Sequence, residues 1–110
     1  MIARVWRGWT SAADADAYRD YLVDTGMRDS RATPGNRGTL VLRRTDGERV
    51  EFTTITLWDS MEAIAGFSGE TGDRAVFYPE DERFLVQREW TVGHHELVHA
   101  DPPLGGDLPA

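Results

Sequence analysis

The 110-residue sequence contains no cysteine, no lysine and no long run of apolar residues. Without cysteine, disulfide bonds, thiolate metal sites and a cysteine nucleophile are excluded. Without lysine, a Schiff-base mechanism is excluded, because all 12 basic residues are arginine. No segment is apolar for long enough to form a transmembrane helix, and the N-terminus lacks the regions of a signal peptide. We therefore expect a soluble cytoplasmic protein with no membrane partner.

The formal net charge of −7 argues against DNA, RNA or an anionic membrane as a partner. The apolar fraction of 40% is typical of a globular chain, and the length suits one domain with one core. We place that domain at residues 1–100. Residues 101–110 hold three prolines and two glycines, so we expect a flexible C-terminal tail there.

The segment 50–67 changes its periodicity part-way along. Residues 50–58 alternate between two sides and are rich in β-branched and aromatic types, which predicts a strand. After Asp59, the apolar residues Ala63, Ile64 and Phe67 recur three and four apart, which indicates one face of a helix. Ser60 can cap the first free N–H groups of that helix. A strand therefore runs directly into a helix.

The rest of the chain supplies four more main elements and one short turn. The patterns predict a strand over 1–9, a helix from Ser11 that stops at Gly26, a strand over 39–44, a helical turn after Pro79 and a strand over 88–99. Asp46-Gly47 marks a tight hairpin before the central strand. The resulting order is β-α-β-β-α-β, an α+β fold of the ferredoxin-like type.

Which side of each strand faces the helices stays open, because an error of one residue inverts it. One assignment leaves large apolar side chains on the side away from the helices: Trp6, Val41, Phe52, Trp58 and Trp90. An apolar face of that size favours a partner, and the simplest partner is a second copy. We therefore expect a homodimer that uses the sheet face and the last strand.

Four segments carry a resemblance to a known family: MIARVWRGWT, PGNRG, EFTTITLWDSMEAIAGF and AVFYPEDERFLV. Together with the histidine-bearing last strand, they resemble the antibiotic-biosynthesis-monooxygenase-like branch of the dimeric α+β barrel superfamily. The resemblance implies a homodimer with two facing sheets, and a small-molecule pocket between sheet and helices in each subunit.

Active members of this group include cofactor-independent monooxygenases that oxidise polyketide anthrones to quinones, and also haem-degrading enzymes. The resemblance implies an asparagine on the first strand or second helix and a tryptophan on that helix. This chain departs from the pattern, with Trp6 or Arg7 on the strand and Ala63 and Phe67 on the helix. Near the haem ligand of the haem enzymes it has residues 76–77, a valine and a phenylalanine.

The candidate site residues each have a structural and a functional interpretation. Arg4 lies between apolar neighbours on a strand, and a buried arginine needs partners. It either pairs with Glu51, Glu89 or Glu96, or it grips a carboxylate or phenolate ligand. The aromatic candidates either pack in the core or stack on a flat ligand, and they are Trp6, Phe52, Trp58 and Phe67. Thr54 adds a hydroxyl beside these rings.

His95 corresponds best to the histidine on the last strand of relatives, so it is either a general base or a hydrogen-bonded structural residue. Tyr78 precedes Pro79 in a loop that either covers the pocket or packs. We expect all these candidates to line one pocket between the sheet and the second helix. No two histidines are spaced to chelate a metal, so we predict no metal site and no bound cofactor.

Two functions remain from these observations. The first is a small cofactor-independent monooxygenase-like protein that acts on an aromatic or polyketide-type molecule. The alternative is a non-catalytic dimeric barrel that binds such a small molecule, and haem binding comes third. The sequence does not decide whether the protein turns over a substrate.

Overall fold

The structure, a computed structural model, describes residues 1–70 and 72–103. The tail expected at 101–110 therefore lies largely outside the described residues. The strands are β1 (Ile2–Ser11), β2 (Asn36–Asp46), β3 (Arg49–Trp58), β4 (Leu85–Arg88) and β5 (Gly93–Glu96). The helices are α1 (Ala15–Leu22), the π-helical η1 (Val23–Met27), α2 (Arg28–Ala32), α3 (Met61–Ser68) and α4 (Asp81–Phe84).

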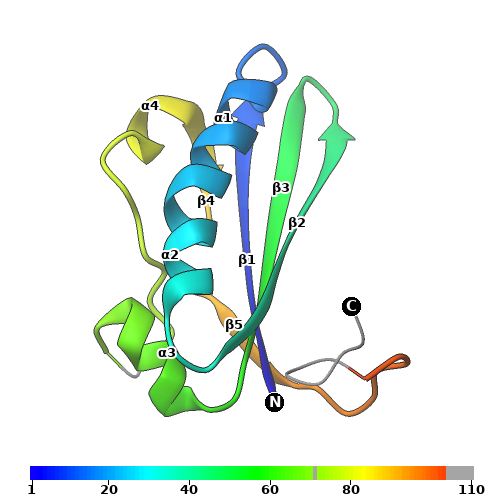
Figure 1. The fold of residues 1–110 in the computed structure, drawn as a ribbon. Helices are drawn as coiled ribbons and strands as arrows, with labels where there is room; N and C mark the ends of the chain where they lie inside the picture. The colour runs from blue at the N-terminus through cyan, green and yellow to red at the C-terminus, as the bar shows by residue number, and fades with distance from the viewer. Residues whose placement is uncertain (71, 104–110) are drawn as a thin grey trace.

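The five strands form one antiparallel sheet in the order β2-β3-β1-β4, with β5 also paired to β1. Figure 1 shows α1 and α2 running along one face of this sheet. This arrangement confirms the predicted α+β, ferredoxin-like β-α-β-β-α-β fold. Among the described elements no helix covers the other face of the sheet. No helix in the described part of the chain combines the length and apolarity that a membrane crossing needs.

The local signals at the central strand and second helix are confirmed. The Oγ of Ser60 accepts a hydrogen bond from Ala63 N at 3.1 Å and so caps α3. Gly69 ends that helix in the left-handed region at φ 79°. The β2–β3 hairpin closes on the pair Asp46 and Arg49, with Gly47 at φ 63° in the two-residue turn.

The sequence predicted that the first helix stops at Gly26, but in the structure the helix does not stop there. It continues through the π-helical turn η1 into α2 and ends at Ala32. Gly26 is buried within that turn, in the middle of the helical run and not at its end. The helix stops where Pro34 forces the preceding residue out of helical geometry, and Thr33 is extended at φ −80° and ψ 129°.

The last strand is divided, whereas the sequence predicted one strand over 88–99. Between β4 and β5 the chain leaves the edge of β1 and bonds to the segment around residue 74. Ala75 N donates to Trp90 O at 3.0 Å, and Val92 N donates to Asp73 O at 2.7 Å. This excursion explains the division, because the backbone groups of residues 90–92 are already satisfied there.

The face assignment that put aromatic side chains away from the helices is wrong. Trp6, Phe52 and Trp58 are buried beneath the helices, and the ring of Phe52 meets that of Tyr18 at a centroid distance of 5.1 Å. Val41 packs against the same core. Only Trp90, between β4 and β5, is exposed, at 63%.

The open face is nevertheless apolar near its centre. The pairing puts Val5 opposite Ile55, and Ile55 opposite Leu40 on the next strand. Leu40 and Leu42 are 50% and 51% exposed. An exposed apolar face of this kind still favours a partner. The residues that form it differ from those that the sequence predicted.

Trp58 anchors α3 to the sheet. It is 0% exposed, its Nε1 donates to Thr56 Oγ1 at 2.8 Å, and its ring stacks with that of Phe67 at 6.0 Å. Trp9 lies on the open face, with the guanidinium groups of Arg7 and Arg49 5.8 Å and 5.4 Å from its ring centroid.

We predict that Trp58→Ala lowers the free energy of unfolding by ~3–5 kcal/mol, the usual loss for a buried tryptophan. Trp9→Ala should cost less, because flexible arginine side chains can settle into the space that it leaves. Urea unfolding followed by circular dichroism measures both. Equal losses for the two variants would contradict this placement of the core.

Candidate functional site

A cavity of about 60 Å³ lies between the sheet, the first helix and the segment 75–81, and we call it the sheet–helix cavity. The strands β1 and β3 contribute Arg4, Trp6, Thr54 and Thr56. The helical run α1–η1–α2 contributes Tyr18, Leu22, Thr25, Gly26, Met27 and Ser30. The remaining wall is made by Phe67, Ala75, Val76, Phe77, Tyr78, Asp81 and Val92.

The π-helical turn η1 shapes the helical wall. Its Thr25, Gly26 and Met27 all line the cavity, and π-helical turns are frequent at functional sites. A Cβ on Gly26 would lie 3.6 Å from Cε2 of Tyr78, an ordinary van der Waals distance, so the ring of Tyr78 packs directly against this turn. The turn and the 75–81 segment therefore fit together around the cavity.

Arg4 brings a positive charge into this cavity. Its side chain is 5% exposed, Nη1 donates to His94 Nε2 at 3.1 Å, and Nη2 donates to Arg74 O at 3.0 Å. Burial lowers the pKa of Arg4 from its ordinary value. Among the described residues no carboxylate lies within ion-pair distance of it.

The structural pairing expected for Arg4 is not what the structure has. Glu51 accepts from Arg44 Nε at 2.7 Å, and Glu89 accepts from Arg7 Nη2 at 2.9 Å. Glu96 pairs in register with Ile2, two residues before Arg4 and on the same side of the sheet, but it is exposed and forms no ion pair with Arg4. Glu51 and Glu89 are thus engaged elsewhere, none of the three acids pairs with Arg4, and the guanidinium retains donors for a ligand.

Aromatic rings form the wall next to Arg4. Trp6 donates its Nε1–H to Glu89 O at 2.7 Å, and its ring meets Phe77 edge-on at 6.2 Å. The guanidinium of Arg88 lies 4.4 Å from the ring centroid of Phe77 and 4.0 Å from that of Trp90. This stack connects the exposed Trp90 to the cavity wall.

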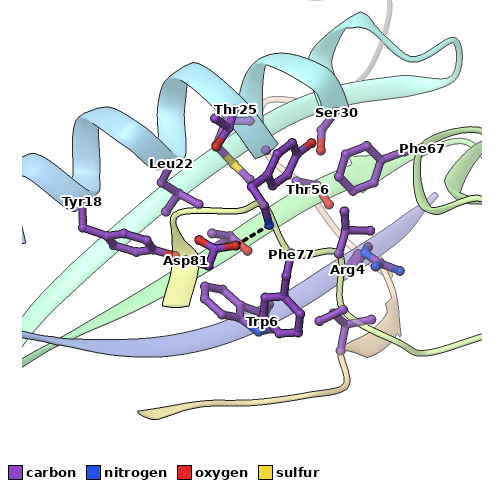
Figure 2. A pocket seen from close by; sticks show the side chains of 17 residues that line it. Arg4, Trp6, Tyr18, Leu22, Thr25, Ser30, Thr56, Phe67, Phe77 and Asp81 are labelled. Atoms are coloured by element: carbon purple, nitrogen blue, oxygen red, sulfur yellow. Dashed lines mark hydrogen bonds between the residues drawn. The ribbon is translucent and has the colours of Figure 1, made fainter. Parts of the chain in front are cut away.

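Asp81 brings a second buried charge. It is 5% exposed, and its Oδ2 accepts from Tyr78 N at 2.7 Å. Burial raises the pKa of its carboxyl above the ordinary value. In Figure 2 Asp81 and Arg4 lie on different sides of the cavity, with Trp6 and Phe77 between them in this view.

The hydroxyl groups that line the cavity differ in their hydrogen-bond partners. Tyr78 donates its phenol hydrogen to Asp29 Oδ2 at 2.7 Å, and burial together with Asp29 raises the pKa of that phenol. Burial and the Asp81 charge raise the pKa of Tyr18. The Oγ of Ser30 is buried and has no hydrogen-bond partner in the described part of the chain, so it can bond to a molecule in the cavity.

Five of the eight site residues expected from sequence line the sheet–helix cavity: Arg4, Trp6, Thr54, Phe67 and Tyr78. Phe52 and Trp58 are on the same sheet side but are buried in the core around it. The expected position beside the second helix needs correction, because the first helix supplies most of the helical wall. Phe67 is the only contribution of α3 among the described lining residues.

The placement of His95 in this pocket is wrong. His95 pairs with Ala3 on the open face, whereas His94 pairs with Arg4 on the cavity side. The pairing of β5 with β1 is shifted by one residue from the expected pairing. His94 therefore takes the place on the cavity side that was expected for His95. The pKa of His94 is lowered by burial and by Arg4, so its ring is neutral at neutral pH and accepts from Arg4 at Nε2.

Sequence reasoning missed Asp81, Phe77 and Ser30 as lining residues. The sequence predicted only a helical turn after Pro79, without a role for Asp81. Its spacing of three residues from Tyr78 is the signal that could have identified a side chain bonded back to the chain. Ser30 could not be found, because its inward position depends on the helix continuing past Gly26.

The same fold occurs in solved structures at low sequence identity. A putative antibiotic biosynthesis monooxygenase from Nitrosomonas europaea is 12% identical with a TM-score of 0.63, over 90% of this chain and 100% of that chain. The haem-degrader MhuD from Mycobacterium tuberculosis, with two haems bound, is 20% identical with a TM-score of 0.56, over 91% and 98%.

The chain has the fold of these proteins. Rv0793 from Mycobacterium tuberculosis, 17% identical with a TM-score of 0.57 over 90% of this chain and 96% of that chain, shares it too. No protein-family model and no curated protein sequence matches the chain. The resemblance to the monooxygenase-like group is therefore confirmed at the level of fold.

The cavity does not fit a haem group. Its volume of about 60 Å³ is far below the ~300–1,000 Å³ of sites that enclose drug-sized ligands. Val76 and Phe77, which lie where the resemblance implies a haem ligand, are hydrocarbon side chains and cannot bond to iron. We therefore derive no chemistry through haem.

We predict that Asp81→Asn raises the melting temperature at pH 7 and that the gain shrinks as the pH is lowered toward 4. The native carboxyl has a raised pKa, so the native state binds its proton more tightly than the unfolded state. The Asp81 contribution to stability therefore rises as pH falls through the native pKa.

Differential scanning calorimetry at several pH values measures this effect. Asp24→Asn, at an exposed position of η1, is the control and should change little. A gain for Asp81→Asn that stays constant from pH 7 to pH 4 would contradict the buried-carboxyl explanation.

Proposed function

We propose that the protein binds a small, flat, anionic aromatic molecule in the sheet–helix cavity and is a cofactor-independent monooxygenase-like protein acting on it. The single observation that carries this proposal is Arg4, a buried guanidinium with no carboxylate partner among the described residues. A buried charge without a counter-charge is costly unless a ligand supplies one.

The chemistry of the cavity suits an aromatic carboxylate or phenolate. A guanidinium has five N–H donors in a planar fork, and neutral acceptors occupy only part of that fork in Arg4. Trp6, Phe67 and Phe77 provide ring surfaces on which a flat molecule can stack. The putative monooxygenase and the haem-degrader of the same fold are consistent with a small-molecule site.

The oxygenase reaction would require no reductant besides the substrate. Loss of a phenol proton gives an electron-rich phenolate, and the positive charge of Arg4 would favour such an anionic ligand in the cavity. Oxidation of a ring-activated CH₂ group by O₂ then places one oxygen atom on carbon as a carbonyl, and the other leaves as water with both hydrogens. The four electrons lost by carbon reduce O₂ completely, so the reaction balances.

The second candidate is binding without turnover. Two observations favour it: none of the described lining residues is a histidine, and the cavity of about 60 Å³ holds a polyketide-type molecule only if the 75–81 segment moves. Under this proposal Arg4 and the rings keep their roles, and no oxygen is consumed.

We predict that Arg4→Gln weakens binding of benzoate about 10- to 100-fold, because a charge-assisted hydrogen bond contributes ~1.5–3 kcal/mol. Isothermal titration calorimetry measures the affinity. Arg7→Gln is a matched control on the opposite side of the same strand, and it should bind benzoate as the wild type does.

Oxygen uptake with a hydroxylated anthrone then separates the two candidates. Uptake by the wild type that Arg4→Gln abolishes supports the monooxygenase-like function. Benzoate binding without uptake supports the binding protein instead. Failure of the wild type to bind benzoate at all would overturn both.

We further propose a homodimer that covers the open face of the sheet. This face has Leu40 and Leu42 half exposed above Ile55 and Val5, and it has no helix over it among the described elements. A second copy of the same face would bury these side chains and close the two sheets on each other.

Light scattering at micromolar concentration should give a dimer for the wild type and a monomer for the double variant Leu40→Glu, Leu42→Glu. The four added charges of two copies would face each other across a desolvated interface, which is strongly unfavourable. Val23→Glu, at a 47% exposed position of η1, should remain dimeric. A wild-type monomer would refute the proposal.

A further inference from the structure

Asp81 is the only carboxylate among the described residues that line the sheet–helix cavity. It is 5% exposed and begins the short helix α4. Of its two oxygen atoms, Oδ2 accepts from Tyr78 N at 2.7 Å, and that bond fixes the carboxylate in place. Among the described residues no arginine or histidine lies within ion-pair distance of it.

Arg88 is the cationic side chain whose charge acts on Asp81, and it is already bound to other groups. Its guanidinium is bonded to Glu82 and lies 4.4 Å from the ring centroid of Phe77 and 4.0 Å from that of Trp90. Asp81 is therefore a buried acceptor with spare capacity, on a different side of the cavity from Arg4 (Figure 2).

We propose that Asp81 accepts the hydrogen of a ligand hydroxyl, so that the ligand is a hydroxylated aromatic acid with its anionic group at Arg4 and its hydroxyl at the remote end. The inference rests on the proposed function and deepens it, because it names the class of ligand. A single flat molecule then meets a donor group at one end and an acceptor group at the other.

The hydroxyl groups of the cavity are less suited to this role, because they are already bonded or, like that of Ser30, carry no negative charge. Tyr78 donates its hydrogen to Asp29 at 2.7 Å, and Thr25 donates to Tyr21 O at 2.7 Å. Thr56 accepts from Trp58 Nε1 at 2.8 Å. Among the described lining residues Asp81 alone combines burial, a negative charge and an oxygen atom without a protein hydrogen-bond partner.

The same contact gives the hydroxyl proton a destination. When the ligand ionises, its O–H bond breaks, the proton moves to a carboxylate oxygen of Asp81, and the electron pair stays on the phenolate oxygen. Burial raises the pKa of Asp81, which makes the carboxylate a stronger acceptor near neutral pH. No histidine is required for this step.

The test compares benzoate and 4-hydroxybenzoate on the wild type, Asp81→Asn and the exposed control Asp24→Asn. Asparagine can keep the bond from Tyr78 N through its oxygen and then presents N–H donors to the ligand. We expect the wild type and the control to bind 4-hydroxybenzoate about tenfold more tightly than benzoate. Asp81→Asn should lose this preference while it binds benzoate unchanged.

The outcomes are distinguishable in calorimetric titrations on variants that circular dichroism shows to be folded. If Asp81→Asn retains the preference, or weakens both ligands equally, the inference is overturned and the proposed function stands. If the wild type binds benzoate but shows no preference for the hydroxyl, the inference also fails. If neither compound binds the wild type, the proposed function itself fails.

Discussion

The antiparallel register of β1 against β3 is the constraint on which the site depends. It sets Arg4 opposite Thr56 and Trp6 opposite Thr54, all on the side that the helices cover. Because side chains alternate along a strand, a slip of β1 by one residue would move Arg4 and Trp6 to the open face. The hairpin turn at Gly47 fixes β2 against β3, and β1 then completes the sheet against the other edge of β3.

How far the sequence could predict this arrangement differs between elements. Local signals were sufficient for α3, where Ser60 caps the start and Gly69 ends the helix, since both act within a few residues. The end of the first helix was not predictable from Gly26, because that part of the helix packs against Tyr78, more than 50 positions along the chain. Tertiary packing overrode the local preference there.

The histidines show the same limit at the level of single residues. Alternation along 88–99 correctly put His94 and His95 on different sides, but it could not say which side faces the helices. That depends on the excursion at 90–92, where the backbone bonds to residues 73 and 75. The apolar neighbours of Arg4 in the sequence marked it as unusual. Its lack of a carboxylate partner could not be predicted, because that depends on where every acidic side chain lies in the fold.

The distribution of charge follows from these placements. The surface arginines are matched to acids at close range, as in Arg37 with Asp59 Oδ1 at 2.8 Å and Arg43 with Asp16 Oδ1 at 2.6 Å. Such exposed pairs contribute little to stability. The two buried charges, Arg4 and Asp81, lack an ion-pair partner in the described part of the chain. An acidic protein thus keeps a cationic group where an anion could reach it.

The π-helical turn η1 has a consequence for how this wall can vary. Each residue of an α-helix advances the chain by ~100° around the helix axis, so one extra residue in a turn rotates everything after it. If η1 tightened to an α-helical turn by loss of one residue, Ser30 would turn away from the cavity and Asp29 away from Tyr78. A single deletion in this turn would therefore exchange the whole set of groups that α2 presents, without altering the sheet. Such a turn is a point where the lining can be replaced in one step while the rest of the fold is kept.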